Sequence, residues 1–165
     1  QQPFFGICLG MQMAIVEFAR NVVGIEEADS GEYRPDHPKN VIDLMPEQSG
    51  HEETGGTMRL GSQTTVLAEG SLIAKVYNKT TISERHRHRY EVMNEFVPQL
   101  ESAGLVISGR NLDRDLVETI ELADHPWIIG CQYHPELKSK PFAPHPLFVS
   151  FARASLHYKQ NSSIR

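Results

Sequence analysis

A cysteine between two glycines near the start of the chain constrains the fold more than any other feature. The apolar residues Phe4, Phe5 and Ile7 precede it and predict the end of a buried strand. From Leu9 onward the apolar residues recur at helical spacing, so the period changes at Cys8. The sequence therefore predicts a strand-to-helix corner of the nucleophile-elbow type, with cysteine in place of serine.

Two glycines, Gly6 and Gly10, stand two residues before and after Cys8. Side chains at both positions would collide in so tight a corner, which predicts that both must be glycine. The corner also places the Cys8 sulfur at a helix N-terminus, where the helix dipole and unpaired N–H groups favour the thiolate. The alternative is a buried structural cysteine, because free cysteine is among the most buried residue types.

Composition and charge narrow the class of protein. The 165 residues suffice for one domain with its own core, and 39% hydrophobic and 22% charged residues are typical of globular proteins. A formal net charge of -5 gives no reason to expect nucleic acid or an anionic membrane as a partner. No apolar run is long enough to span a bilayer, and the two cysteines are too few for a disulfide scaffold. We expect a cytoplasmic protein. Because the chain opens almost directly on a core strand, we also expect it to be part of a longer polypeptide.

The remainder of the chain alternates short apolar runs with polar turns. Strands are predicted at residues 41–44, 57–67, 105–108, 117–122 and 127–132. Helices are predicted at residues 9–23, 71–77, 94–104 and 145–158. The acidic segment 24–40 is a long loop of the kind that often serves function, and 45–56 is the best candidate for a linker. Cys131 falls in the last predicted strand, where we expect it to serve packing.

A thiol nucleophile needs a base, and the base needs a group that orients it. His134 and Glu136 offer both, directly after the apolar strand predicted at 127–132. Residues two apart in an extended segment point to the same side, and Pro135 biases His134 toward extended backbone. Glu136 can then hold one imidazole nitrogen while the other faces Cys8, at a strand end where open α/β sheets place their sites. The alternative is a surface loop with two unrelated polar residues.

The most polar run of the chain carries three arginines and two histidines in alternation. In an extended strand Arg85, Arg87 and Arg89 share one face, while His86 and His88 share the other. Interleaved arginines would repel a metal cation, and a nucleic-acid patch would require a basic protein. We therefore expect no metal site. An arginine here suits a bidentate clamp on a carboxylate, and a solvated charged face is the alternative.

Taken together, Cys8, His134 and Glu136 give the chain a resemblance to the class I (triad) glutamine amidotransferases. The motifs that carry it are G-I-C-L-G-M-Q at residues 6–12 and H-P-E at residues 134–136. Within that group the chain is similar to the glutaminase domains of CTP synthases. This similarity rests on four further segments, G-G-T-M-R-L-G (55–61), R-H-R-H-R-Y-E-V (85–92), H-P-W-I-I-G-C-Q-Y-H-P-E (125–136) and H-P-L-F (145–148).

The resemblance implies an α/β fold, flavodoxin-like, in which helices flank a mostly parallel central sheet with hairpin additions near residues 57–67. It also implies that residues 1–165 form one glutaminase domain. The N-terminal part of that domain, with the glycine-rich turn that supplies a second oxyanion-hole donor, would lie upstream of Gln1. The implied nucleophile is Cys8, its base is His134, and the carboxylate that orients the base is Glu136. The N–H of Leu9 is the implied oxyanion-hole donor, and Gln12 is the residue that lines the glutamine site. Glu32 and Arg89 are implied to hold the substrate's α-amino and α-carboxylate ends, respectively.

The activity implied is hydrolysis of L-glutamine, which supplies ammonia for the ATP-dependent amination of UTP to CTP. No cofactor is expected in this domain, whereas ATP, UTP and Mg²⁺ are expected in an amidoligase domain that is absent from this chain. The implied partners are that domain and further copies in a homo-tetramer, with no nucleic acid and no membrane.

Two alternatives stay open. One is another class I glutaminase, of the anthranilate or carbamoyl-phosphate type, against which the run at 85–90 argues. The other is an inactive fragment with a role in assembly or regulation.

Overall fold

The computed structural model describes residues 1–44 and 58–162, and the linker predicted at 45–56 lies outside them. A six-stranded sheet with the order β1-β9-β8-β7-β4-β5 forms the centre. Its strands are β1 (Phe4–Ile7), β4 (Arg59–Leu67), β5 (Thr81–His88), β7 (Leu105–Asn111), β8 (Leu116–Leu122) and β9 (Ile128–Cys131). A smaller sheet is ordered β2-β3-β6 and consists of β2 (Asp29–Ser30), β3 (Asn40–Asp43) and β6 (Glu91–Val92).

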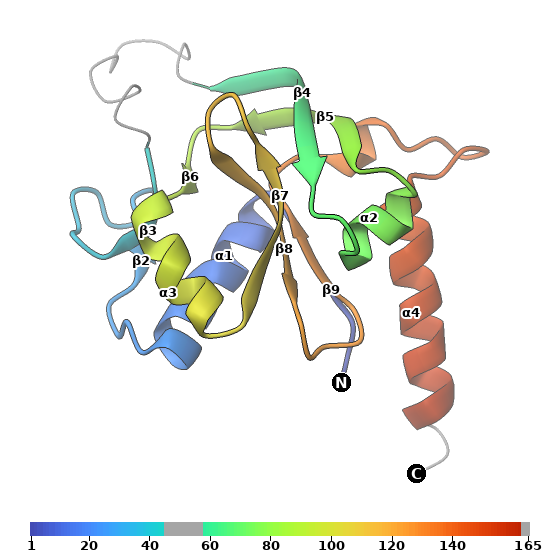
Figure 1. Cartoon of the computed structure of the whole chain (residues 1–165), viewed down its shortest axis with the longest axis horizontal. Coiled ribbons are helices and arrows are strands. Elements are labelled where there is room, and N and C mark those ends of the chain that lie inside the picture. The colour runs from blue at the N-terminus through green and yellow to red at the C-terminus, as the bar shows by residue number, and fades with distance from the viewer. Residues whose placement is uncertain (45–57, 163–165) are drawn as a thin grey trace.

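Helices cover both faces of the central sheet. They are α1 (Leu9–Phe18), α2 (Leu72–Tyr77), α3 (Val97–Ser102) and α4 (Pro146–Ser162). A π-helical turn (Ala19–Val23) prolongs α1 until Gly24, whose φ of 87° ends it. A 3₁₀ turn (Asn94–Phe96) precedes α3, so the single helix predicted at 94–104 is split in two. In Figure 1, α1 and α3 lie on one side of the sheet and α2 and α4 on the other.

The α/β class and the flanking helices are confirmed, but the described sheet is mixed rather than mostly parallel. β1 and β9 pair in parallel, whereas β9–β8, β8–β7, β7–β4 and β4–β5 all pair antiparallel. The cause lies in the connections. Short turns join β7 to β8 and β8 to β9, whereas parallel neighbours need a crossover of about a dozen residues or more.

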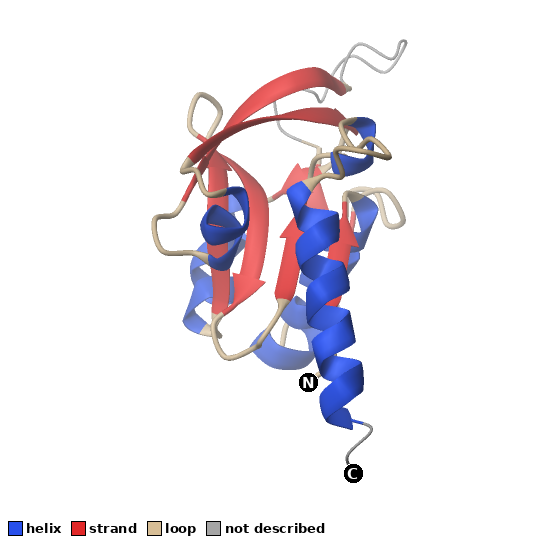
Figure 2. Cartoon of the chain, turned by 90° about the vertical axis from the view of Figure 1, so that its right-hand side faces the viewer, coloured by secondary structure: helices blue, strands red, loops and turns tan. Residues whose placement is uncertain are grey.

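The additions predicted near residues 57–67 take the form of one long strand, β4. It contains a positive-φ glycine, Gly61 (φ 81°), and pairs with β5 along most of its length. Figure 2 shows these two strands as a curved ribbon that arches above the other strands. The run of alternating arginines and histidines therefore belongs to this ribbon.

Two apolar clusters fill the space on either side of the sheet. The cluster beneath α1, α3 and the small sheet includes Met11, Ile15, Ile42, Leu100 and Ile120. The cluster beneath α2 and α4 includes Ile73, Trp127, Ile129, Tyr133 and Leu147. Since both faces of the central strands are covered, polar side chains that act on a ligand have to project from the strand ends.

Candidate active site

Cys8 lies where β1 ends and α1 begins, as the elbow motif predicts. It is the N-cap residue of α1, and its φ of 50° with ψ of -107° is a backbone conformation that L-residues rarely adopt. Its N–H donates to the carbonyl oxygen of Cys131 at 2.7 Å, which anchors the corner on the neighbouring strand β9. Such unusual backbone conformations cluster at functional sites.

The two glycines of the elbow turn out to differ. A Cβ on Gly6 would lie 2.9 Å from backbone atoms of Gly10 and Met11, so glycine is required at position 6. A Cβ on Gly10 would meet nothing within 4 Å among the described residues, so the crowding predicted at Gly10 is wrong. The reason is geometric, because Gly6 lies under the first turn of α1 and Gly10 on the open side of that turn.

The histidine and glutamate of the predicted triad leave the sheet at the same edge as Cys8. β1 and β9 are parallel neighbours in which Ile7 pairs with Cys131, so the residues that follow each strand emerge together. Nδ1 of His134 lies 2.5 Å from Oε1 of Glu136. The backbone N–H of His134 donates to the carbonyl oxygen of Arg85 at 2.9 Å, which fixes this segment against β5.

The segment after His134 is a 3₁₀ turn (Pro135–Leu137), so the prediction of an extended segment is wrong beyond His134. Proline suits the first position of a helical turn because its φ is already set. The pairing of His134 with Glu136 is nevertheless present, and it assigns the ring nitrogens. With Nδ1–H donating to the carboxylate, Nε2 of the neutral ring is an acceptor. This Nε2 is buried and has no hydrogen-bond partner among the described residues, which leaves it available to take a proton.

The thiol of Cys8 is not ionised in advance. Burial raises the pKa of Cys8 most, and the negative charges of Glu136 and Glu91 raise it further. The backbone N–H of Leu9 and the side chain of Gln132 lower it, but the net pKa is above the ordinary value. The helix N-terminus thus favours the thiolate, as expected, but desolvation outweighs the contribution of the Leu9 N–H. A base has to remove this proton before the sulfur can attack.

Two amide side chains connect the Cys8 sulfur to the core. Gln132 is fully buried, and its Nε2 donates to Sγ of Cys8 at 3.6 Å. Its Oε1 accepts a hydrogen bond from Nε2 of Gln12 at 3.1 Å. Nε2 of Gln12 also donates to the carbonyl oxygen of Tyr90 at 2.9 Å. Gln132 was not among the residues predicted from the sequence, although a polar residue at the end of an apolar strand is a signal that could have found it.

The alternation predicted for the arginine–histidine run is confirmed. Along β5, Arg85 and Arg87 are exposed, while His86 and His88 are buried. Arg89 follows the strand and is also exposed. The interpretation of the run as two chemically distinct faces therefore holds, with the arginines on the outer one.

Glu32 and Arg89, the two residues implied for substrate binding, come from different segments of the chain. Glu32 follows β2 and Arg89 precedes β6, and these strands belong to one small sheet through β3. Burial raises the pKa of Tyr90; the charges of Glu32 and Asp43 raise it further, and that of Arg89 lowers it. The charges of both predicted binding groups therefore influence the same phenol, and both side chains are exposed. Their roles stay predictions.

A buried group of charged residues lies on the inner face of β5, and no pattern in the sequence predicted it. This Arg59 cluster consists of Arg59, His86, His88, Glu91 and Glu118. Arg59 donates to Glu91 at 3.0 Å and to Glu118 at 2.7 Å. Nε2 of His88 lies 2.7 Å from Glu91, and Nε2 of His86 lies 3.6 Å from Glu118. The cluster joins β4, β5, β6 and β8, and so holds the segment that carries Tyr90.

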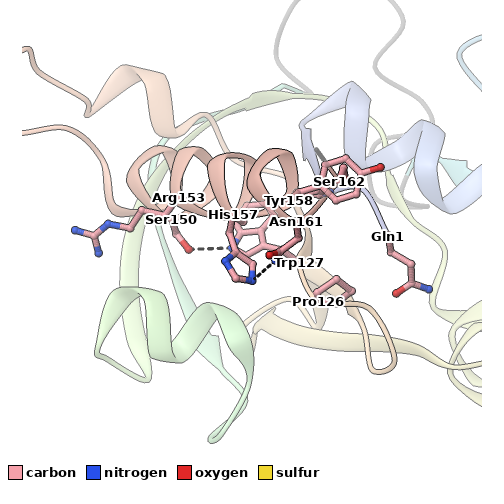
Figure 3. Close-up of a pocket in the computed structure, with 11 residues that line it drawn as sticks. Gln1, Pro126, Trp127, Ser150, Arg153, His157, Tyr158, Asn161 and Ser162 are labelled. Carbon is pink, nitrogen blue, oxygen red and sulfur yellow. Dashed lines mark hydrogen bonds between the residues drawn. The ribbon is translucent and has the colours of Figure 1, made fainter. Parts of the chain in front are cut away.

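A cavity of about 730 Å³ lies elsewhere, between the first residues of the chain and α4 (Figure 3). Its lining includes Trp127, whose Nε1 donates to Oγ of Ser150 at 2.9 Å. Trp127 precedes β9 whereas His134 follows it, so this cavity is at the opposite end of the strand from the elbow. None of the predicted site residues lines it, and we do not assign it to the reaction.

Within residues 1–44 and 58–162, no three or more histidine, cysteine, aspartate or glutamate side chains are grouped so that they could hold a metal ion. No helix in the same ranges has both the length and the apolar character needed to cross a membrane.

Comparisons with known proteins agree with this geometry. The family described as glutamine amidotransferase class-I matches residues 1–154. The CTP synthase of Geobacter metallireducens is 56% identical over 161 residues, which cover 98% of this chain and 30% of that protein. The CTP synthase of Aquifex aeolicus is 54% identical over 158 residues, covering 96% of this chain and 30% of that protein. The chain thus spans about three tenths of the length of these curated relatives.

Solved structures give the same picture. The glutaminase domain of the Trypanosoma brucei CTP synthase, solved with bound acivicin, is 35% identical and superposes with a TM-score of 0.88. The match covers 94% of this chain and 60% of that one. A putative GMP synthase subunit from Thermoplasma acidophilum is 16% identical with a TM-score of 0.59, and it shares the fold. That match covers 98% of this chain and 61% of the other.

Proposed function

The chain belongs to the class-I glutamine amidotransferases, and on that premise we propose that it hydrolyses L-glutamine at Cys8 and releases ammonia. One observation carries the proposal. A cysteine at a strained strand-to-helix corner leaves the sheet at the same edge as a histidine whose Nδ1 is held by a carboxylate and whose Nε2 has no partner among the described residues. A nucleophile, a base and an orienting group in this order are what covalent catalysis by a thiol needs.

The first half of the reaction transfers one proton through His134. Nε2 takes the proton of the Cys8 thiol as the sulfur attacks the γ-carboxamide carbon of glutamine. The Leu9 N–H, at the start of α1, is the proposed donor to the oxyanion that forms. His134 then gives its proton to the leaving nitrogen, the carbon–nitrogen bond breaks, and ammonia departs from a glutamyl thioester. Glu136 stabilises the imidazolium that exists between these two transfers.

The second half regenerates the thiol. His134 removes a proton from water, which attacks the thioester carbonyl, and the sulfur leaves with the proton from Nε2. The products are glutamate and the resting enzyme. Burial and the two carboxylates that raise the pKa of Cys8 favour the neutral thiol at rest, so the sulfur becomes nucleophilic only when the base acts.

The substrate's own charges explain two more residues. Free glutamine carries an ammonium and a carboxylate on its α-carbon, and a selective site should pair both. We assign Glu32 to the ammonium and Arg89 to the carboxylate, because both are exposed charges acting around Tyr90. Gln12, bound to the Tyr90 carbonyl, is the proposed lining residue between them and Cys8.

In the longer protein we propose that the ammonia serves the ATP-dependent amination of UTP to CTP. Identities above 50% to CTP synthases support this assignment. ATP, UTP and Mg²⁺ would bind an amidoligase domain outside this chain, and the complete enzyme would be a homo-tetramer. A cytoplasmic location fits the two free cysteines, Cys8 and Cys131.

The experiment that tests the proposal compares the two cysteines in the complete protein. Cys8→Ala should abolish glutamine-dependent CTP formation and spare ammonia-dependent formation, because the thiol serves only ammonia release. Cys131→Ala is the matched control, since it removes the other thiol and should keep both activities. If Cys8→Ala keeps its glutamine-dependent activity, or loses both activities, Cys8 is not the nucleophile we take it for.

A further inference from the structure

Gln132 lies between the nucleophile and the core, and nothing in the proposed reaction gives it a task. It is fully buried at the end of β9, and its Nε2 contacts Sγ of Cys8 at 3.6 Å. We propose that Gln132 is a positioning residue that presents a fixed N–H donor to the Cys8 sulfur and thereby stabilises the thiolate when His134 takes the proton. This inference rests on the proposed function, because it assumes that Cys8 is the nucleophile.

The direction of the hydrogen bonds follows from one backbone carbonyl. The Tyr90 carbonyl can only accept, so the side chain of Gln12 must turn Nε2 toward it. The same Nε2 donates to Gln132, which must therefore present Oε1 to Gln12. The remaining end of the Gln132 amide is Nε2, and it faces Cys8. A flipped Gln132 would set two donors against each other.

Because the Gln132 amide cannot flip, its N–H always faces the Cys8 sulfur and interacts differently with the thiol and the thiolate. An amide N–H binds an anionic acceptor more strongly than a neutral one, so the contact favours thiolate over thiol. The surroundings otherwise disfavour the charge. Burial raises the pKa of Cys8, and Glu136 from the turn after β9 and Glu91 from β6 add to the rise. Two groups lower this pKa, the Leu9 N–H and Gln132, and they follow the two paired strands β1 and β9.

The amide chain also joins the nucleophile to the segment proposed to bind substrate. Tyr90, whose carbonyl sets the orientation, follows Arg89 directly. The sulfur and the proposed carboxylate clamp are therefore connected through two buried side chains, without passing through the triad. The positions of Gln12 and Gln132 then matter for the acidity of Cys8 as well as for packing.

The test measures the pH dependence of Cys8 alkylation by iodoacetamide in the complete protein, with the modified peptide identified by mass spectrometry. Gln132→Leu keeps a similar volume but removes the donor, and it should shift the alkylation midpoint to higher pH. Below the midpoint its rate should fall about tenfold or more, as expected for the loss of a charge-assisted hydrogen bond. Gln132→Glu should fall further, because a carboxylate repels the thiolate.

Two more variants separate positioning from packing. Gln12→Leu leaves Gln132 in place but frees its amide to flip, so it should give a smaller shift in the same direction. Gln63→Leu makes the same substitution on β4, outside the hydrogen-bond chain that runs from Tyr90 through Gln12 and Gln132 to Cys8, and should keep the wild-type profile. Glutamine turnover by Gln132→Leu should recover as the pH is raised, which a purely structural defect would not do.

The outcomes are distinguishable. If Gln132→Leu and Gln12→Leu both keep the wild-type pH profile at Cys8, the positioning role is overturned, whatever happens to turnover. In that case an inactive Cys8→Ala would leave the proposed function standing. If instead Cys8→Ala still hydrolyses glutamine, the proposed function fails, and the inference about Gln132 fails with it.

Discussion

The site around Cys8 and His134, here called the elbow site, and the Arg59 cluster are both buried and polar, but their charged groups have opposite effects. In the Arg59 cluster one guanidinium binds two carboxylates, Glu91 and Glu118, so charge is compensated inside the protein. At the elbow, the negative charges of Glu136 and Glu91 instead act on a thiol and raise its pKa. We interpret the Arg59 cluster as a group of residues that stabilises the fold, and the elbow as a group of residues that transfers protons.

The two regions also arise differently from the sequence. Cys8 is fixed by its immediate neighbours, and His134 and Glu136 are two residues apart. The Arg59 cluster assembles residues from four strands. Glu91 belongs to both regions, because it accepts from Arg59 and also raises the pKa of Cys8. Substitutions should therefore affect turnover at the elbow and stability in the cluster.

The largest expected effect is on catalysis. His134→Ala should lower glutamine-dependent turnover about 10²- to 10⁴-fold, the range for loss of a general acid–base, since both proton transfers pass through this ring. Ammonia-dependent synthesis by the complete protein should persist. Glu136→Gln should do less damage, because the amide oxygen can still orient the ring but does not stabilise the imidazolium. Near-wild-type rates for both variants would end the triad assignment.

In the cluster, the effect should appear as stability. Arg59→Leu leaves two buried carboxylates without their partner and should lower the free energy of unfolding by about 3–5 kcal/mol. Arg85→Leu is the matched control on the exposed face of β5 and should change it by less than about 0.5 kcal/mol. Urea denaturation measures both. Equal losses in the two variants would show that the buried ion pairs do not hold the β4–β5 ribbon.

Substrate affinity should respond at a third place, the proposed clamp. A charge-assisted hydrogen bond is worth about 1.5–3 kcal/mol, or about 10- to 150-fold in binding. Glu32→Ala and Arg89→Ala should therefore raise KM for glutamine by such factors while ammonia-dependent synthesis stays intact. Arg89→Lys should rescue only in part, because a point charge lacks the guanidinium fork. Arg87→Ala, at the preceding exposed position, is the control. A wild-type KM in both alanine variants would remove these residues from the substrate site.

The smallest expected effect in the wild-type protein is a pH dependence of the free energy of unfolding that arises from the Arg59 cluster. Burial raises the pKa of Glu118 from 4.5 to about 7, so the folded state keeps a proton that the unfolded chain has released, and stability falls as pH rises through this range. Burial and the charge of Arg59 lower the pKa of His86 from 6.5 to about 2. Here the unfolded chain binds the extra proton, and stability rises with pH.

Between pH 4.5 and 6.5 these two slopes oppose each other, each at about 1.4 kcal/mol per pH unit. Glu118→Gln leaves only the slope of His86, so the free energy of unfolding of this variant should rise with pH in this window. His86→Asn leaves only the slope of Glu118, so the free energy of unfolding of this variant should fall. The free energy of unfolding measured from pH 4.5 to 6.5 checks the sign of each slope. If both variants keep the wild-type slope, the cluster does not titrate in this way.

The same contrast explains what the sequence could predict. The Cys8 corner, the pairing of His134 with Glu136 and the two faces of β5 depend on neighbours along the chain, and all three are present. The partners of Arg59 come from other strands and those of Gln132 from the start of α1, far away in the sequence, so no local spacing predicts them. Whether neighbouring strands pair in parallel or antiparallel depends on the length of the connections between them, which composition does not reveal. The pKa of Cys8 depends on what covers the sulfur, which the motif alone does not contain.

The most direct test of the account is to see which thiol a glutamine analogue with an electrophilic side chain modifies. Cys8 is half-buried at the strand end, whereas Cys131 is fully buried in the core and its pKa is raised well above the ordinary value by burial. Mass mapping should find the adduct on Cys8 and none on Cys131, and added glutamine should slow its formation. An adduct that forms first on Cys131, or turnover that survives complete modification of Cys8, would contradict the central claim.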